Sequence, residues 1–255
     1  MKRILSLLIA MLLGLSALPA PAGAAEASSW ASPYLNNLVN RAVMKGDPDG
    51  QLYPNRTVTR AEFAAMLNRA FGFSEPGTAK FRDVSPTAWY AADIGVAANQ
   101  GYLRGDSKGA NPVGSLTREE AAAMLCRALK IAPVEGEQFR LTDERSFSNW
   151  SRGYINAAAE KGFVSGYPNG SFQPKNRITR GEAAKMLSEV AGEIRNNATQ
   201  TRLGRTINGN LTISSSSVTL SDVTVTGDLY ITEGVGRGYV QLDNVTVLGD
   251  RKSVV

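Results

Sequence analysis

Three arginines occupy the same place in a motif that occurs three times in the chain. The motif reads VTRAEFAAML at 58–67, LTREEAAAML at 116–125 and ITRGEAAKML at 178–187. Its threonine and the glutamate three residues later form the pattern of a helix capping box, in which each side chain bonds the backbone N–H of the other residue. Helix formation does not explain the arginine, because a cation in the first turn faces the positive end of the helix dipole. The arginines are Arg60, Arg118 and Arg180, and the capping pairs are Thr59 with Glu62, Thr117 with Glu120, and Thr179 with Glu182.

Two interpretations of these arginines are open at this point. In the structural one, each guanidinium reaches a nearby carboxylate, for example one in the neighbouring repeat. In the functional one, the guanidinium and the free N–H groups of the first helical turn converge on a carboxylate or phosphate ligand. The threefold occurrence excludes an accident of composition, but it fits both interpretations.

The motif belongs to a larger repeat with a period of about 60 residues. Each repeat has a tryptophan, a helical stretch, a loop rich in Gly, Pro, Asp and Asn, and a second helix that starts at the motif. We interpret the tryptophans as core anchors rather than as platforms for sugar stacking, because they stand at a helix start. The loops either simply turn the chain or bring their backbone close to a ligand. The tryptophans are Trp30, Trp89 and Trp150, and a glycine follows each of them 16 residues later, at Gly46, Gly105 and Gly166.

Composition narrows the chemistry further. The chain has no histidine, which excludes His-dependent catalytic triads, His-based metal sites and a His general base. The single cysteine, Cys126, lies in an apolar helical run and is expected to be a buried thiol. We interpret Asp83 and Asp143, which precede the second and third repeats, as turn or cap residues. No catalytic residue, metal site or cofactor is predicted.

The first 25 residues have the pattern of a secretory signal peptide. MKR is followed by the apolar run ILSLLIAMLLGLSAL and by the small-residue stretch PAPAGAA. Cleavage would remove Lys2 and Arg3 and so lower the net charge of +5 by two. A mildly positive chain permits an anionic partner without identifying one.

The character of the sequence changes after about residue 192. The polar stretch 194–205 is expected to be a linker. Beyond it, VTLSDVTVTGD at 218–228 returns 22 residues later as VQLDNVTVLGD at 240–250. Alternating apolar residues in such a repeat predict stacked β-rungs. The rungs are too few to bury a continuous core, so we expect that the chain is a fragment or that another subunit completes the stack.

A tryptophan, a helix, a loop such as GYPNGSFQP and the pattern [VLI]-T-R-x-E-x-x-x-M-L, three times over, resemble a triplet of S-layer homology (SLH) domains across residues 28–192. The resemblance implies a mainly α, pseudo-threefold module with a central three-helix bundle and grooves between neighbouring repeats, followed here by the β-rich, solenoid-like segment. It also implies an exported protein that is anchored non-covalently at the bacterial cell wall. The implied partner is an anionic, often pyruvylated secondary cell wall polysaccharide. No nucleic acid is expected as a partner, and no membrane after signal cleavage.

In SLH domains the arginine of the motif contacts the anionic sugar, and residue matching gives this role to Arg60, Arg118 and Arg180. The copies are unequal, because TREE places Glu119 beside Arg118 and the second loop is one residue shorter. We therefore expect the groove that contains Arg180 to bind best and the groove that contains Arg118 to bind least. The candidate glycan-binding set also holds five loop residues: Gly46, Gly105, Gly166, Asp47 and Asp106.

The expected organisation is a signal peptide at 1–25, SLH repeats at 26–75, 76–135 and 136–193, a linker at 194–205 and an incomplete β-repeat segment at 206–255. The main function expected is wall anchoring without enzyme activity. One alternative is a wall-tethered β-solenoid enzyme that degrades polysaccharide. Another is a lattice subunit that self-associates through the β segment.

Overall fold

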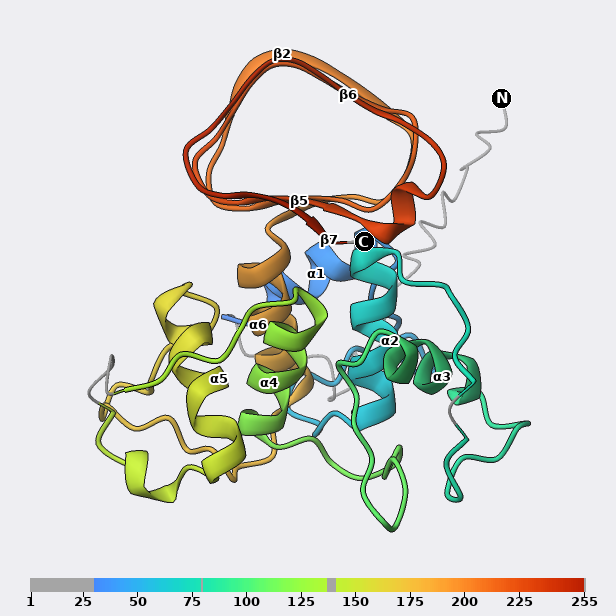
Figure 1. Ribbon diagram of the computed structural model, residues 1–255, viewed down its shortest axis with the longest axis vertical. Helices are drawn as coiled ribbons and strands as arrows, with labels where there is room; N and C mark the ends of the chain where they lie inside the picture. Colours follow the sequence, from blue (N-terminus) through green and yellow to red (C-terminus); the bar gives the residue numbers. More distant parts are fainter. Residues whose placement is uncertain (1–29, 79, 137–140, 255) are drawn as a thin grey trace, which may run out of the picture.

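A computed structural model describes residues 30–78, 80–136 and 141–254, with the side chains of 199–203 and Val254 left undescribed. The predicted signal peptide lies outside the described residues. Within these described residues, six α-helices occupy one end of the molecule, and two parallel β-sheets are stacked at the other end (Figure 1).

Each repeat supplies one outer and one inner helix. The outer helix of one repeat packs against the inner helix of the repeat before it, so that α3 lies on α2, α5 on α4 and α1 on α6. The inner helices α2, α4 and α6 also contact one another. The outer helices are α1 (Ser32–Asn40), α3 (Ala91–Asn99) and α5 (Asn149–Glu160), and the inner ones are α2 (Arg60–Phe71), α4 (Arg118–Ala128) and α6 (Arg180–Ala191).

A ring of backbone hydrogen bonds joins the three repeats just before the inner helices begin. The N–H of Val58 donates to the carbonyl of Ile178 at 3.0 Å, that of Ile178 to Leu116 at 3.0 Å, and that of Leu116 to Val58 at 2.9 Å. The cycle closes on itself, so each repeat contacts both others. Alanines in the inner helices, such as Ala122 and Ala183, are fully buried and allow the helices to approach closely.

Residues after α6 form rungs of a parallel β-solenoid. One sheet has the order β1-β3-β5-β7 and the other the order β2-β4-β6. Val218 of β4 pairs with Val240 of β6, which is one sequence repeat further along the chain. The stretch 194–205, expected to be a linker, lies largely in β1 and β2. The strands are β1 (Glu193–Arg195), β2 (Thr199–Ile207), β3 (Leu211–Ile213), β4 (Val218–Val225), β5 (Leu229–Thr232), β6 (Val240–Val247) and β7 (Arg251–Val254), with short 3-10 turns at Glu144–Ser146 and Glu233–Val235.

The expectation of a mainly α fold is wrong. The described chain carries seven strands beside its six helices, and the strands enclose a hydrophobic core of their own, which includes Leu211, Leu220 and Val225. The physical reason is that successive rungs share in-register apolar positions, so that even a short stack buries Val, Leu and Ile between its two sheets.

The solenoid is docked on the C-terminal ends of the inner helices. The Tyr230 side chain of β5 is fully buried and belongs to the helical core rather than to the core of the solenoid. The hydroxyl of Thr212 donates to the carbonyl of Ala191 at 2.7 Å. At Gly72, which ends α2 with φ of 67°, an added Cβ would lie 2.6 Å from Gly234 Cα. Helices and sheets are therefore packed without a spacer.

Candidate functional site

The repeated motif forms three capping boxes, as its sequence predicts. In α2 the Oγ1 of Thr59 accepts from the N–H of Glu62 at 3.1 Å, and Oε2 of Glu62 accepts from the N–H of Thr59 at 2.8 Å. Thr117 with Glu120 and Thr179 with Glu182 repeat this arrangement at α4 and α6. Burial acts to raise the pKa of Glu62, but the backbone bond from Thr59 and the contact with Arg56 outweigh it and leave the pKa lowered.

The first-turn N–H groups are not free to bind an anion. Arg60 N–H donates to the carbonyl of Gly114 at 3.0 Å, and Ala61 N–H donates to that of Pro112 at 2.9 Å. The third N–H is taken by the capping threonine. The same positions in α4 donate to Asn176 and Pro174, and those in α6 to Arg56 and Pro54. The hypothesis of an anion held by open helix N-termini is therefore wrong, because loop carbonyls of the neighbouring repeat occupy them.

Each motif arginine contacts the capping glutamate of the next repeat. Arg60 Nη1 lies 2.8 Å from Glu120, whereas Arg180 Nη1 lies 3.5 Å from Glu62. Arg118 Nη1 is 3.9 Å from Glu182. All three arginines are buried. The pairs run around the ring of repeats in one direction. The ion pairs that the structural interpretation predicts are therefore formed.

The same guanidinium groups hold the glycine-rich loops. Arg180 donates from Nε to the carbonyl of Leu52 and from Nη2 to that of Lys45, both at 2.7 Å. Arg60 likewise bonds the carbonyls of Ala110 and Arg104.

Arg118 departs from the other two motif arginines. Its Nη2 donates to the carbonyl of Ser165 at 2.7 Å, while its buried Nε has no partner among the described residues. Tyr167 takes the place of the aspartate found in the other loops, and its hydroxyl donates to Glu182 at 2.5 Å. Burial raises the pKa of Tyr167, and the bond to Glu182 adds to the rise. The Arg118 guanidinium lies 4.8 Å from the centre of the Tyr167 ring.

The first glycine of each loop is closely packed, and the packing is tightest at Gly105. An added Cβ at Gly105 would lie 2.6 Å from the Phe81 ring and 2.7 Å from the carbonyl oxygen of Gly109. The second glycine supplies a positive φ, which is 79° at Gly50 and 78° at Gly170. An added Cβ at Gly46 would lie 3.1 Å from the carbonyl oxygen of Gly50, and one at Gly166 would lie 3.1 Å from Cδ2 of Leu141.

Four aspartates contact these loops. Asp47 and Asp106 belong to the loops themselves, and Asp83 and Asp143 lie in the segments that precede the second and third repeats. Asp106 Oδ1 accepts from the N–H of Lys108 at 2.7 Å, whereas Asp47 pairs with Arg56 at 3.1 Å. Asp83 accepts from the loop N–H groups of Ala110 and Asn111. Asp143 does the same for Phe172 and Gln173. Asp83, Asp106 and Asp143 thus secure loop backbone, whereas Asp47 pairs with a side chain.

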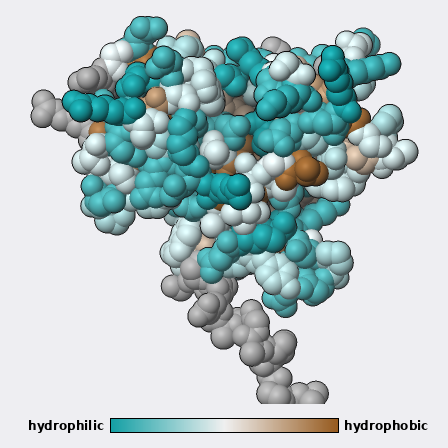
Figure 2. Space-filling view, turned by 90° about the horizontal axis from the view of Figure 1, so that it is seen from below, coloured by the Kyte–Doolittle hydropathy of each residue, from teal (hydrophilic) through white to brown (hydrophobic). Residues whose placement is uncertain are grey.

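Three grooves lie between the repeats, at equivalent positions. Each is lined by the motif arginine of one repeat, the glycine loop, capping glutamate and methionine of the next, and the tryptophan of the one after. We call them groove 1, beside Gly46, groove 2, beside Gly105, and groove 3, beside Gly166. Their volumes are about 280, 400 and 440 Å³. Figure 2 views the molecule from the end opposite the sheets, where small hydrophobic patches lie among hydrophilic side chains.

The tryptophans are not core anchors, and that expectation is wrong. Trp30, Trp89 and Trp150 are 47%, 63% and 49% exposed. Trp89 lines groove 1, Trp150 groove 2 and Trp30 groove 3. Their position at a helix start does not bury them, because each ring lies at the groove of the preceding repeat.

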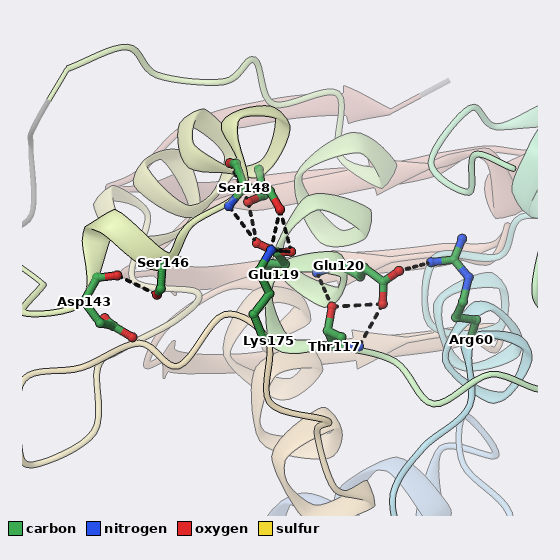
Figure 3. A network of polar contacts seen from close by, with 9 residues as sticks. Arg60, Thr117, Glu119, Glu120, Asp143, Ser146, Ser148 and Lys175 are labelled. Atoms are coloured by element: carbon green, nitrogen blue, oxygen red, sulfur yellow. Dashed lines mark hydrogen bonds and ion pairs between the residues drawn. The ribbon is translucent and has the colours of Figure 1, made fainter. Parts of the chain in front are cut away.

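Glu119 has a structural role. Its buried carboxylate accepts from the hydroxyls of Ser148 and Ser151 and from Lys175, the last at 2.5 Å (Figure 3). Burial acts to raise its pKa, but these bonds outweigh burial and lower the pKa. Glu119 does not line groove 3, and its charge is compensated by Lys175.

Among the groove residues that sequence reasoning missed, one stands at the same position in every repeat. Ten residues after the capping threonine, each inner helix presents a charged side chain to its groove: Arg69 in groove 1, Arg127 in groove 2 and Glu189 in groove 3. The helical period was the available signal, since the capping glutamate, the methionine and this residue stand at intervals of four and three.

Comparison with known proteins agrees with this architecture. The S-layer homology domain pattern matches residues 25–64, 80–122 and 140–184, which together make up half of the chain. The chain belongs to the S-layer homology family. SLH domains anchor proteins to the cell surface, and membership places this chain among secreted, wall-attached proteins.

Individual SLH relatives include enzymes and surface-layer proteins. The chain is 38% identical to an amylopullulanase of Thermoanaerobacterium thermosulfurigenes over 174 residues, which are 65% of this chain and 9% of the enzyme. It is 30% identical to the surface-layer 125 kDa protein of Lysinibacillus sphaericus, covering 64% of this chain and 14% of that protein. It is 25% identical to S-layer protein sap of Bacillus anthracis, covering 89% and 28%. The chain thus spans less than a third of the length of these relatives.

Proposed function

We propose that the SLH triplet binds an anionic, pyruvate-bearing secondary cell wall polysaccharide non-covalently and so holds the exported protein on the wall. The observation that carries the proposal is the set of three equivalent grooves, each with an exposed indole and cationic side chains. A sugar ring stacks favourably on an aromatic face, and guanidinium groups recognise carboxylates through paired hydrogen bonds.

The motif arginines serve this function mainly by shaping the grooves. Each guanidinium has five N–H donors, and Arg180 uses three of its nitrogen atoms on Leu52, Lys45 and Glu62. Arg180 lines groove 1 but is almost fully buried, so it supports the groove wall. The glycines at 46, 105 and 166 line the grooves without a side chain, so a ligand can approach the loop backbone closely. We place the three SLH repeats that form these grooves at residues 26–75, 76–135 and 136–193.

Retention of the purified chain on isolated cell walls tests the proposal. We expect the chain to sediment with intact walls and to stay in solution with walls from which the non-peptidoglycan polymer has been extracted. Equal retention on both kinds of wall would contradict it. A variant that replaces the three tryptophans by alanine is expected to lose retention, because the indoles are exposed and their removal leaves the core intact.

A further inference from the structure

We infer that Arg69 and Arg127 recognise the acidic group of the glycan, and that Glu189 excludes this group from groove 3, so that the triplet has two anion-binding grooves instead of three. The inference rests on the proposed function and names the residues that decide which grooves take a charged sugar.

The motif arginines of grooves 1 and 2, Arg180 and Arg60, cannot supply this discrimination, because their charge is already compensated. Arg60 and Arg180 are buried, pair with Glu120 and Glu62, and donate to two loop carbonyls each. A guanidinium that is paired and bonded in this way presents little net charge to a ligand. The charge that attracts an acid must come from other side chains in the grooves.

Arg127 of groove 2 is held by aromatic rings rather than by a carboxylate. Its guanidinium lies 4.6 Å from the centre of the Tyr154 ring and 5.8 Å from that of Trp150. Its Nε is buried without an acceptor, and no described carboxylate lies within ion-pair distance. The aromatic rings orient the guanidinium without neutralising it. An acidic substituent on a sugar stacked against Trp150 would meet this cation.

Arg69 holds the equivalent place in groove 1, with weak internal contacts. It lies 4.0 Å from Asp93 and 3.4 Å from the carbonyl of Val43. Glu189 stands at this position in groove 3, where its carboxylate accepts from Tyr34 at 3.5 Å. Among the residues that line the grooves, the sign of the charge reverses only at this position.

The charges that line the grooves also separate grooves 1 and 2 from groove 3. Groove 1 has Lys45, Arg69 and Arg180 against Asp47 and Glu62. Groove 2 has Arg60, Arg104 and Arg127 against Asp106 and Glu120. Groove 3 has Arg118 and Lys185 against Glu182 and Glu189, so it alone carries no excess of cations. Repulsion between Glu189 and a second carboxylate disfavours an acidic sugar there.

Calorimetric titration of the full chain tests the inference. The probe is a methyl hexoside that carries a pyruvate ketal, and the same hexoside without the ketal is the matched neutral ligand. We expect two sites per chain for the ketal sugar. Arg127→Gln is expected to weaken one site about tenfold or more, the effect of losing a charge-assisted hydrogen bond, and Glu189→Arg is expected to add a third site. Lys108→Gln, an exposed loss of the same charge at a residue that does not line groove 2, serves as the control and should change affinity much less.

Several results would overturn the inference. These are three sites in the unaltered chain, unchanged binding by both Arg127→Gln and Arg69→Gln, or two sites in a folded Glu189→Arg variant. Because Glu189 is partly exposed, the gain of a site remains measurable even if Arg127→Gln fails to fold. If the chain is retained by intact walls but ignores the ketal, the inference fails while the proposed function stands.

Discussion

At the scale of single residues, the repeated motif combines two tasks that sequence reasoning separated. Its threonine and glutamate cap their own helix, and the same glutamate receives the arginine of the preceding repeat. The capping boxes were predictable because they are local in sequence. The arginine's partners were not, because they come from another repeat and depend on how the ring closes.

Loss of a motif arginine should destabilise the fold before it affects binding. Arg180→Gln leaves the carbonyls of Leu52 and Lys45 without their charged donor inside the protein. We expect the free energy of unfolding to fall by about 1–3 kcal/mol, measured by urea denaturation. Arg177→Gln, which removes an exposed arginine nearby, is the control. A loss of less than about 0.5 kcal/mol at Arg180 would show that the loop does not depend on it.

Glu119 predicts a pH dependence of stability. Its pKa is lowered from 4.5 in the folded protein, so the unfolded state binds its proton more readily. Its contribution to stability is therefore present above about pH 4.5 and is lost as the pH falls through the folded pKa. We expect urea midpoints of the unaltered chain to fall more steeply below pH 5 than those of Glu119→Gln. Parallel pH profiles for the two proteins would contradict this role.

At the scale of elements, the glycine loops are held by packing as much as by turn conformation. The residue pattern indicated tight turns, but only the structure shows which glycine carries the positive φ and which avoids a neighbour. The tryptophans illustrate the same limit. Periodicity places them at a helix start, and it gives no information on whether another repeat covers them.

Gly105→Ala should strain the loop of groove 2. The new methyl group would lie 2.6 Å from the Phe81 ring, so the ring or the loop must shift. We expect a loss of about 1–3 kcal/mol in the free energy of unfolding, measured by thermal or urea denaturation. Gly95→Ala in α3 is the matched control, since an added Cβ there has no neighbour closer than 4.0 Å. Equal stability of the two variants would mean that the loop accommodates a side chain.

At the scale of the whole molecule, the solenoid is part of the folded core. The shift in composition after α6 suggested a separate segment behind a linker, whereas the strands begin almost at once and Tyr230 reaches into the helical core. Sequence periodicity showed the rungs, but it did not mark the residues that dock them, such as the buried Tyr230.

Tyr230→Ala should therefore destabilise the helices and the sheets together. Removal of a fully buried aromatic side chain costs about 3–5 kcal/mol, and we expect one cooperative transition at lower temperature in both the helical and the strand signals of circular dichroism. Tyr239→Ala, which alters an exposed tyrosine of the solenoid, is the control. A helical transition that stays at its original temperature would show that the two parts unfold independently.

The central claim is that the triplet recognises the acidic group of a wall polysaccharide. The most direct measurement is a calorimetric titration of the full chain with polymer released from cell walls, before and after its pyruvate ketals are removed. We expect binding to the intact polymer and an affinity at least about tenfold lower without the ketals, as for loss of a charge-assisted contact. Equal affinity for both polymers would contradict recognition of the acid.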